Sequence, residues 1–280
     1  MQQNSQKNTH GGARKPSHKK LGLALGSGGA RGIAHIGFLQ ALEEAHIRVS
    51  YITGCSMGAV VGALYAANIP MEQVKKEALS LKLMRIASFN VAPLKNGLFH
   101  MGKAKKLLES YLGSLRFSDL KIPFACVATD LTEGKLAVLD EGNVVDAVIA
   151  SSSIPGAFTP AELGGRRFVD GGILERVPVN ALKKMGAEVI VAVDVLGDLM
   201  QKNLKTGTID TLLRCIDIMD TRSTQGKKRA RSRYVDLWLE PALGAMDQYR
   251  VDGESMRVAY ETGYALGIEV REKIKKLTEN

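Results

Sequence analysis

Apolar residues recur along this chain in short continuous runs that alternate with longer stretches at helical spacing. Residues 21–25 form an uninterrupted apolar run typical of a central parallel strand, and residues 33–46 carry apolar side chains at helical spacing. A second strand is predicted over residues 48–53 and a second helix over residues 59–67. This order of elements predicts a parallel sheet with helices on both of its faces.

The same pattern continues beyond Pro70, which opens a polar amphipathic helix. Further helices are expected over residues 102–111, 143–151, 179–185, 207–222 and 254–276, and further strands over 122–129, 135–139, 188–195 and 234–239. One face of helix 207–222 carries Ile209, Leu212, Leu213, Ile216 and Met219. Because no repeat and no linker interrupts the pattern, we expect a single domain over residues 20–280, with its chemistry-bearing motifs in residues 20–195.

A stretch without any charge, residues 49–71, raises the question of a membrane span. Polar and glycine residues interrupt it, and it ends near Pro70. A strand, a tight turn and a core helix therefore fit it better than one continuous membrane helix.

The formal net charge of +9 is concentrated in two places. Residues 1–20 hold five basic residues and no acid, and residues 200–235 hold nine basic residues against three aspartates. The low apolar content of residues 1–19 predicts a disordered basic tail. Three cysteines without a metal-binding or disulfide pattern indicate a reducing compartment, and no secretory signal is visible, so we expect a cytoplasmic protein.

The chemistry centres on Gly54-Cys55-Ser56-Met57-Gly58, a G-x-S-x-G pentapeptide between the second strand and the second helix. A serine on such a sharp turn has a strained backbone, and the flanking glycines let neighbouring main chain come close. The turn would present the hydroxyl of Ser56 at the end of the sheet, above a helix N-terminus that favours negative charge. Glycine-rich turns that contain a serine are also common without any catalytic role, so other residues have to decide.

A glycine-rich loop, Gly26-Ser27-Gly28-Gly29-Ala30-Arg31-Gly32, follows the first strand. A dinucleotide-binding fingerprint that starts at Gly26 would need a glycine at position 31, and the G-K-[ST] of a P-loop is absent. What remains is a run of backbone amides at a helix N-terminus, which can bind the oxyanion of a tetrahedral acyl intermediate. Arg31 would fix this loop, face an anionic substrate or form a salt bridge at the edge of the core.

The order of the residues argues against a Ser-Asp-His triad. The chain has no histidine after residue 100, because its five are His10, His18, His35, His46 and His100. A carboxylate acting directly on the serine is the economical alternative, and Asp170 is the candidate because a strand-like segment delivers it and Gly171 and Gly172 leave room beside it. A simple Asp-Gly turn is the structural alternative. We therefore expect that catalysis requires no histidine.

Together, these features resemble the patatin-like phospholipase family in its compact bacterial form. The glycine loop over residues 26–32 is similar to the family's oxyanion loop, the pentapeptide around Ser56 to its nucleophile elbow, and Asp170-Gly171-Gly172 to its D-G-[AG] motif. Residues 151–160 resemble the proline-containing block that precedes the aspartate. The loop begins Gly26-Ser27 where plant members begin Asp-Gly, but its amides are retained.

The resemblance implies a three-layer α/β/α fold with a mostly parallel central sheet. It also implies a Ser-Asp dyad, in which Ser56 attacks an ester carbonyl, Asp170 accepts its proton, and amides around Gly28 and Gly29 hold the oxyanion. Water would then release the acid from an acyl-enzyme, with no metal and no cofactor. The implied substrates are phospholipids, lysophospholipids and other acyl esters. A non-catalytic or regulatory protein that acts as a binding partner is the alternative.

The two basic segments predict a reversible contact with an anionic membrane surface, which would place the protein peripherally at the inner face of the membrane. We expect this contact to be electrostatic, because no long apolar face is expected to be free. A solvated basic loop over residues 227–233 accounts for the same residues. Nucleic acid is not expected as a partner, because no aromatic residues alternate with the basic run.

Overall fold

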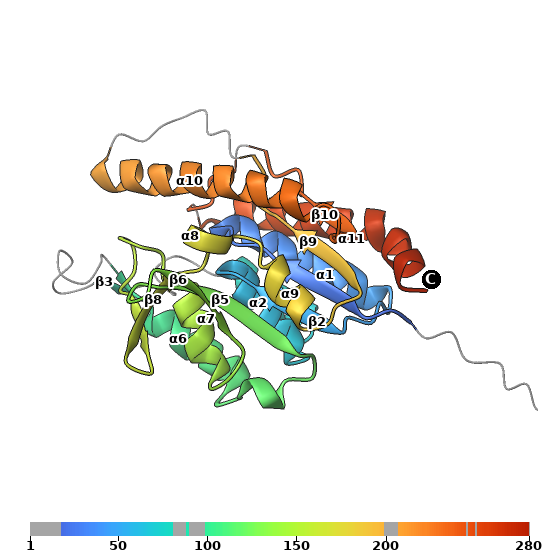
Figure 1. Ribbon diagram of the computed structural model, residues 1–280, viewed down its shortest axis with the longest axis horizontal. Helices are drawn as coiled ribbons and strands as arrows, with labels where there is room; N and C mark the ends of the chain where they lie inside the picture. The colour runs from blue at the N-terminus through green and yellow to red at the C-terminus, as the bar shows by residue number, and fades with distance from the viewer. Residues whose placement is uncertain are drawn as a thin grey trace, which may run out of the picture.

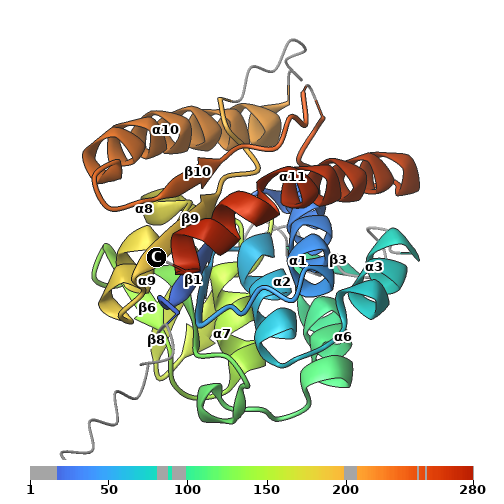
Figure 2. The same ribbon diagram turned by 90° about the vertical axis from the view of Figure 1, so that its right-hand side faces the viewer.

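The computed structural model describes residues 18–80, 88–89, 99–198, 207–244, 246–249 and 251–279. In this part of the chain, a sheet of eight strands runs through the molecule, with helices on both faces (Figure 1 and Figure 2). Its strands lie in the order β10 (Leu237–Leu239), β9 (Val189–Val193), β1 (Leu21–Leu25), β2 (Tyr51–Gly54), β5 (Phe124–Asp130), β8 (Arg166–Asp170) and β7 (Ala161–Leu163), and β6 (Lys135–Leu139) also pairs with β5. The strands from β10 to β5 are parallel, whereas β6, β7 and β8 form an antiparallel edge.

Alternating side chains of β1 separate the two helical layers. Leu21, Leu23 and Leu25 belong to the larger core, which also contains residues of α1 (Ala34–Glu44), α2 (Met57–Ala66) and α11 (Gly253–Glu279). Ala24 belongs to a smaller core on the other face, together with residues of α9 (Val179–Lys184). A strand that is buried on both faces explains why the sequence reads as a continuous apolar run there.

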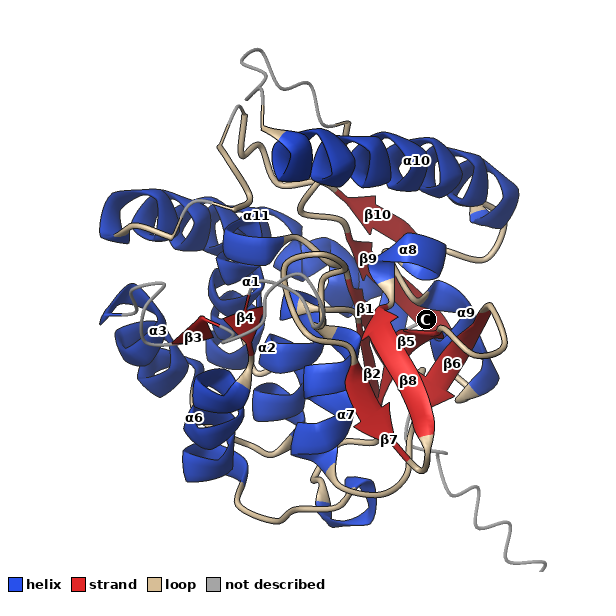
Figure 3. Cartoon of the chain, turned by 90° about the vertical axis from the view of Figure 1, so that its left-hand side faces the viewer, coloured by secondary structure: helices blue, strands red, loops and turns tan. Residues whose placement is uncertain are grey.

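The remaining elements complete these layers (Figure 3). They are α3 (Met71–Ser80), α6 (Gly102–Leu112), α7 (Val144–Ser151), α8 (Gly172–Glu175), α10 (Thr208–Arg231), the 3-10 turns η1 (Gly29–Ile33) and η2 (Phe117–Asp119), and the pair β3 (Ser88–Phe89) and β4 (Phe99–His100). Within the described ranges, none of the helices combines the length and the apolar content needed to cross a bilayer.

The C-terminal helix α11 packs directly on α1. A Cβ atom on Gly263 would lie 1.9 Å from the carbonyl oxygen of Ala34, and one on Gly37 would lie 2.1 Å from that of Tyr260. The two backbones therefore touch at these glycines, which no larger residue could replace without moving a helix. Residues beyond position 195 thus share the core of the motif-bearing part of the chain.

Most of the expected elements are present, and their ends differ by only a few residues. The short strand β7 and the single-turn helix α8 were not expected, and neither was the antiparallel edge of the sheet. The predicted disordered tail lies outside the described residues, apart from its last two positions.

The helix expected over residues 207–222 differs from its prediction in two respects. It continues to Arg231, and only part of its predicted apolar side is covered: Leu212 and Met219 are 60% and 64% exposed, whereas Leu213 and Ile216 are half-buried. The inner side instead carries the buried residues Asp217 and Asp220. The expectation that no apolar face would be free is therefore wrong.

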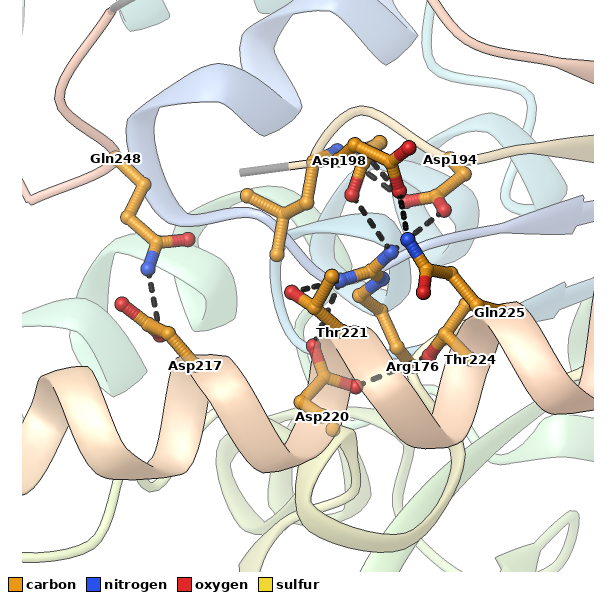
Figure 4. A network of polar contacts seen from close by, with 12 residues as sticks. Arg176, Asp194, Asp198, Asp217, Asp220, Thr221, Thr224, Gln225 and Gln248 are labelled. Carbon is orange, nitrogen blue, oxygen red and sulfur yellow. Dashed lines mark hydrogen bonds and ion pairs between the residues drawn. The ribbon is translucent and has the colours of Figure 1, made fainter. Parts of the chain in front are cut away.

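A buried arginine explains why α10 turns its acidic side chains inward. Nη1 of Arg176 donates to Asp220 on α10 at 2.9 Å, and Nη2 donates to Asp194, directly after β9, at 2.8 Å (Figure 4). The Arg176 side chain is only 1% exposed. One cation thus ties the end of the sheet to α10, and the three charges can be buried only as a set, because each of them alone would be uncompensated.

Replacing Arg176 with methionine should therefore lower the free energy of unfolding by about 3–5 kcal/mol, because Asp194 and Asp220 would stay buried without a cation. The matched control is Arg257→Met, which removes an exposed ion pair with Glu261 worth less than about 1 kcal/mol. Urea unfolding followed by circular dichroism measures both variants. Equal losses in the two variants would contradict a structural role for the Arg176 cluster.

Candidate active site

One edge of β5 is used by two strands in succession. β2 pairs with residues 124–126 of β5 and ends at Gly54, whereas β8 pairs with residues 128–130 and places Asp170 opposite Ala128. The other edge is occupied by β6, which pairs with both Cys126 and Ala128. β2 and β8 therefore pair with successive parts of the same edge of β5. This arrangement places the turn after β2 next to the end of β8.

Ser56 occupies this turn with φ 52° and ψ −122°, a left-handed conformation that is strained for a residue with a side chain. The turn packs against the end of β1, where a Cβ atom on Gly58 would lie only 2.2 Å from the carbonyl oxygen of Leu25. The amide of Ser56 donates to Oγ of Ser151, at the end of α7, at 3.0 Å. Packing and hydrogen bonding thus hold the strained turn in place.

The hydroxyl of Ser56 lies beside the carboxylate of Asp170 and lowers its pKa, and Oδ1 of Asp170 accepts the thiol of Cys55 at 3.7 Å. The same Oδ1 atom also accepts the amide of Gly172 at 2.8 Å. The backbone of Asp170 is held on both sides, since its amide donates to the carbonyl of Ser153 at 2.9 Å and its carbonyl accepts the hydroxyl of Thr129 at 3.0 Å. The carboxylate is therefore fixed against the serine.

The two side chains are almost completely buried, with Ser56 4% and Asp170 5% exposed. Burial raises the pKa of Asp170 to about 6, and the hydroxyl of Ser56, the amide of Gly172 and the thiol of Cys55 limit this rise. The carboxylate is thus ionised at neutral pH but is a stronger proton acceptor than an ordinary aspartate. Burial likewise raises the pKa of the neighbouring Cys55 well above its usual value, so its thiol stays protonated.

The glycine loop offers fewer free amides than its sequence suggests. The amides of Gly26, Ala30 and Arg31 already donate to the carbonyls of Val193, Gln248 and Gly28, respectively. Among the described residues, no acceptor is found for the amides of Gly28 and Gly29. Gly32 lies within η1, where a Cβ atom would lie 2.4 Å from Cγ of Met57, so that the loop packs directly on the start of α2.

Arg31 and His35 lie inside the protein behind this loop. Arg31 is 4% exposed, and burial lowers the pKa of its guanidinium while the nearby carboxylate of Asp194 opposes the change. His35 is fully buried, and burial lowers its pKa to about 4, so the imidazole is neutral. Its Nε2–H donates to the carbonyl of Gly26 at 2.8 Å, which supports the loop.

Two of the other histidines have described side chains. His18 and His46 are exposed. His10 and the side chain of His100 lie outside the described part of the chain.

An apolar cavity of about 240 Å³ is lined by Ser56 and Gly29. Most of its wall consists of aliphatic side chains from α2, α3, α6, α7 and α11, among them Val60, Leu64, Ala78, Leu108, Ile149 and Met256. Its shape and lining suit a hydrocarbon chain. In the described ranges, no group of three or more His, Cys, Asp or Glu side chains is arranged to hold a metal ion.

Several supports of the site have no signal in a motif. Ser151 and Ser153 belong to the quoted block before the aspartate, but only the structure shows that they bond the backbones of Ser56 and Asp170. Gln248 lies in a segment without any periodic pattern, and its carbonyl holds the amide of Ala30 at 2.8 Å. The bonds from Ser153 and Gln248 are main-chain hydrogen bonds that many residue types can make, so the identities of these two residues carry little information, whereas Ser151 contributes its side-chain hydroxyl.

Known proteins resemble this chain in sequence over the part that carries the site. A family model described as patatin-like phospholipase matches residues 23–183, more than half of the chain. An uncharacterized NTE family protein of Mycobacterium tuberculosis is 37% identical over 187 residues, which are 66% of this chain and 51% of that protein. Lysophospholipase NTE1 of Debaryomyces hansenii is 33% identical over 192 residues, which are 65% of this chain and 12% of that protein. The chain thus matches about half of the mycobacterial relative and a much smaller part of the fungal one.

Solved structures share the fold at low sequence identity. VipD from Legionella pneumophila superimposes with a TM-score of 0.56 and 15% identity, covering 92% of this chain and 67% of that one. ExoU from Pseudomonas aeruginosa, in its complex with SpcU, gives a TM-score of 0.52 and 15% identity, covering 95% and 54%. The α/β fold expected from the resemblance is confirmed. The chain belongs to the patatin-like phospholipase family.

Proposed function

We propose that this protein is a serine lipid acyl hydrolase, a carboxylic ester hydrolase of the phospholipase or lysophospholipase type. The observation that carries the proposal is the placement of the strained, buried Ser56 beside the buried carboxylate of Asp170, next to an apolar cavity. Ser56 is the nucleophile and Asp170 is the proton acceptor.

In the acylation step, Oγ of Ser56 forms a bond to the carbonyl carbon of the ester while its proton moves to Asp170. The carbonyl oxygen takes up the negative charge, and the amides of Gly28 and Gly29 are the loop donors that remain available to hold it. Collapse of the tetrahedral intermediate breaks the ester bond, and the leaving alcohol takes the proton from Asp170. The acyl group is then attached to Ser56.

In the deacylation step, Asp170 accepts a proton from water as the water oxygen bonds to the acyl carbon. The bond between this carbon and Ser56 breaks, and the serine oxygen regains a proton from Asp170. The carboxylic acid leaves, and the starting state is restored. This cycle uses two residues of the chain, loop amides and water.

The substrate class follows from the cavity beside Ser56. A wall made mostly of aliphatic side chains, with Glu77 as the charged residue of the described lining, favours the hydrocarbon chain of a lipid over a polar acyl group. The name of the fungal relative, a lysophospholipase, supports the same class. A non-catalytic binding protein would gain nothing from holding Ser56 in a strained conformation that costs roughly 1–3 kcal/mol.

Two substitutions test the dyad directly. Ser56→Ala and Asp170→Asn should each lower turnover of a water-soluble p-nitrophenyl ester by on the order of 10³-fold or more, because the two groups act as a unit. The control Ser110→Ala removes an exposed hydroxyl from α6 and should leave turnover unchanged. Circular dichroism checks that all variants are folded. Near-normal turnover in Asp170→Asn would show that another group accepts the proton.

The raised pKa of Asp170 predicts how activity and stability depend on pH. Activity, as kcat/KM, should fall below about pH 6, because a protonated Asp170 cannot accept the proton of Ser56. The folded state binds this proton more tightly than the unfolded state, so the ionised group destabilises the fold above pH 6 and ceases to do so as the pH falls below about 4.

Asp170→Asn should therefore be more stable relative to the wild type at pH 7 than at pH 4, by about 1–3 kcal/mol. Urea unfolding at the two pH values measures this difference. Asp146→Asn, at an exposed carboxylate paired with Lys105, is the control and should keep the acid limb of the activity profile at its wild-type position. An acid limb near pH 4 in the wild type would contradict the assignment of Asp170.

Filling the cavity with a larger side chain should lower turnover of long-chain esters more than turnover of short-chain esters. Ala104 on α6 lines the cavity, and Ala104→Phe should lower turnover of a long-chain ester by about tenfold or more while sparing an acetate ester. Ala104→Ser adds little volume and serves as the control. A parallel loss for both ester lengths would show that the acyl chain does not occupy this cavity.

A further inference from the structure

The outer side of α10 exposes a group of apolar residues that no other part of the described chain covers. Leu212, Ile218 and Met219 are 60%, 49% and 64% exposed, and Cys215 between them is also exposed. Their spacing places them on one side of the helix, which we call the apolar face of α10. In Figure 1 and Figure 2, α10 runs along the outside of the molecule. Exposed apolar groups of this kind mark sites of interaction.

The charges of α10 are sorted between its two sides. Asp217 and Asp220, the two acids of α10 whose side chains the structure describes, are buried. Arg222 and Arg229 are exposed, and neither has an ion-pair partner in the described residues. The outward surface therefore combines apolar and cationic side chains.

The basic run at the C-terminal end of this helix offers fewer free cations than its composition suggests. Lys227 donates to the carbonyl of Leu174, Lys228 pairs with Glu240, and Arg231 pairs with Glu175. These three cations are occupied within the protein. The expected electrostatic contact over residues 227–233 is thus left mainly to Arg229 and Arg233, and the apolar face supplies a second source of affinity.

The inner side of α10 reaches the wall of the cavity. Oδ1 of Asp217 accepts Nε2 of Gln248 at 2.8 Å and the hydroxyl of Tyr249 at 3.0 Å. Gln248 and Tyr249 both line the cavity beside Ser56 (Figure 4 shows the bond to Gln248). Asp217 lies between Ile216 and the exposed Ile218 in the sequence, so the apolar face is only one helix diameter away from residues of the cavity wall.

We propose that the apolar face of α10, together with Arg222 and Arg229, docks this protein on the surface of an anionic lipid bilayer. Leu212, Ile218 and Met219 enter the interfacial region, and the two arginines bind the anionic headgroups. This inference rests on the proposed function, since a lipid acyl hydrolase has to take its substrate from a lipid aggregate. Docking on this helix brings the cavity wall next to the bilayer.

The sorting of charges favours a bilayer over a second copy of the chain. If two apolar faces met in a dimer, the arginines of both copies would be drawn together, while Asp217 and Asp220 would stay buried and unable to pair with them. An anionic bilayer supplies the missing negative charge over the whole surface. It also accepts the apolar side chains, which a purely electrostatic contact would leave in water.

Co-sedimentation with vesicles of phosphatidylglycerol and phosphatidylcholine tests the proposal. Leu212→Ser/Met219→Ser should weaken binding by at least about tenfold, because two large apolar side chains no longer leave water. The matched control, Leu131→Ser/Val138→Ser, removes two exposed apolar side chains near the β5–β6 hairpin and should bind as the wild type does. Arg222→Gln/Arg229→Gln should reduce the preference for phosphatidylglycerol over pure phosphatidylcholine vesicles.

A water-soluble ester separates this proposal from the proposed function. Leu212→Ser/Met219→Ser should keep its turnover of the soluble ester and lose turnover of vesicle lipid. A wild type that binds vesicles but hydrolyses neither substrate would contradict the proposed function and leave docking supported. Wild-type binding by Leu212→Ser/Met219→Ser, or sedimentation-velocity data showing a dimer that this variant dissociates, would overturn docking on a bilayer.

Discussion

The candidate site depends on how the edge of β5 is shared between two strands. β2 pairs in parallel with the first part of this edge and ends at Gly54, and β8 pairs antiparallel with the part that follows. Ser56 and Asp170 therefore lie close together, although 114 positions separate them in the sequence. This arrangement leaves no space for side chains at the junction, where a Cβ atom on Gly171 would lie 2.3 Å from the carbonyl of Val127. The glycines beside Ser56 and Asp170 are thus needed for the close packing of the strands as well as for the chemistry.

Buried polar groups hold the surroundings of this junction. Arg176 joins Asp194 and Asp220 through its side chain and accepts the amide of Ser27 with its backbone carbonyl at 3.0 Å, so the ion cluster also anchors the glycine loop. The same cluster requires carboxylates on the inner side of α10, and Leu212, Ile218 and Met219 are left on its outer side. The position of the glycine loop and the exposed apolar face of α10 therefore depend on the same ion cluster.

The sequence predicted the parts in which local pattern and fold agree. Continuous apolar runs identified β1 and β9, and the glycine spacing around Ser56 identified the turn after β2. The prediction from sequence failed for α10, because helical periodicity identifies an apolar side but does not show which side of the helix faces the core. The residue that decides this, Arg176, is remote in sequence. The sequence also suggested more free amides in the glycine loop than the structure has. The amide of Ala30 donates to the carbonyl of Gln248, which lies in a segment without a periodic apolar pattern.

As the nucleophile, Ser56 should be covalently modified by a reactive acyl-like group. Reaction with a fluorophosphonate, followed by peptide mass spectrometry, tests it most directly, since such probes react with activated serines. We expect an adduct confined to the peptide that contains Ser56, formed far more slowly in Asp170→Asn. No adduct at any probe concentration, or an adduct on another residue with Ser56 unmodified, would contradict it.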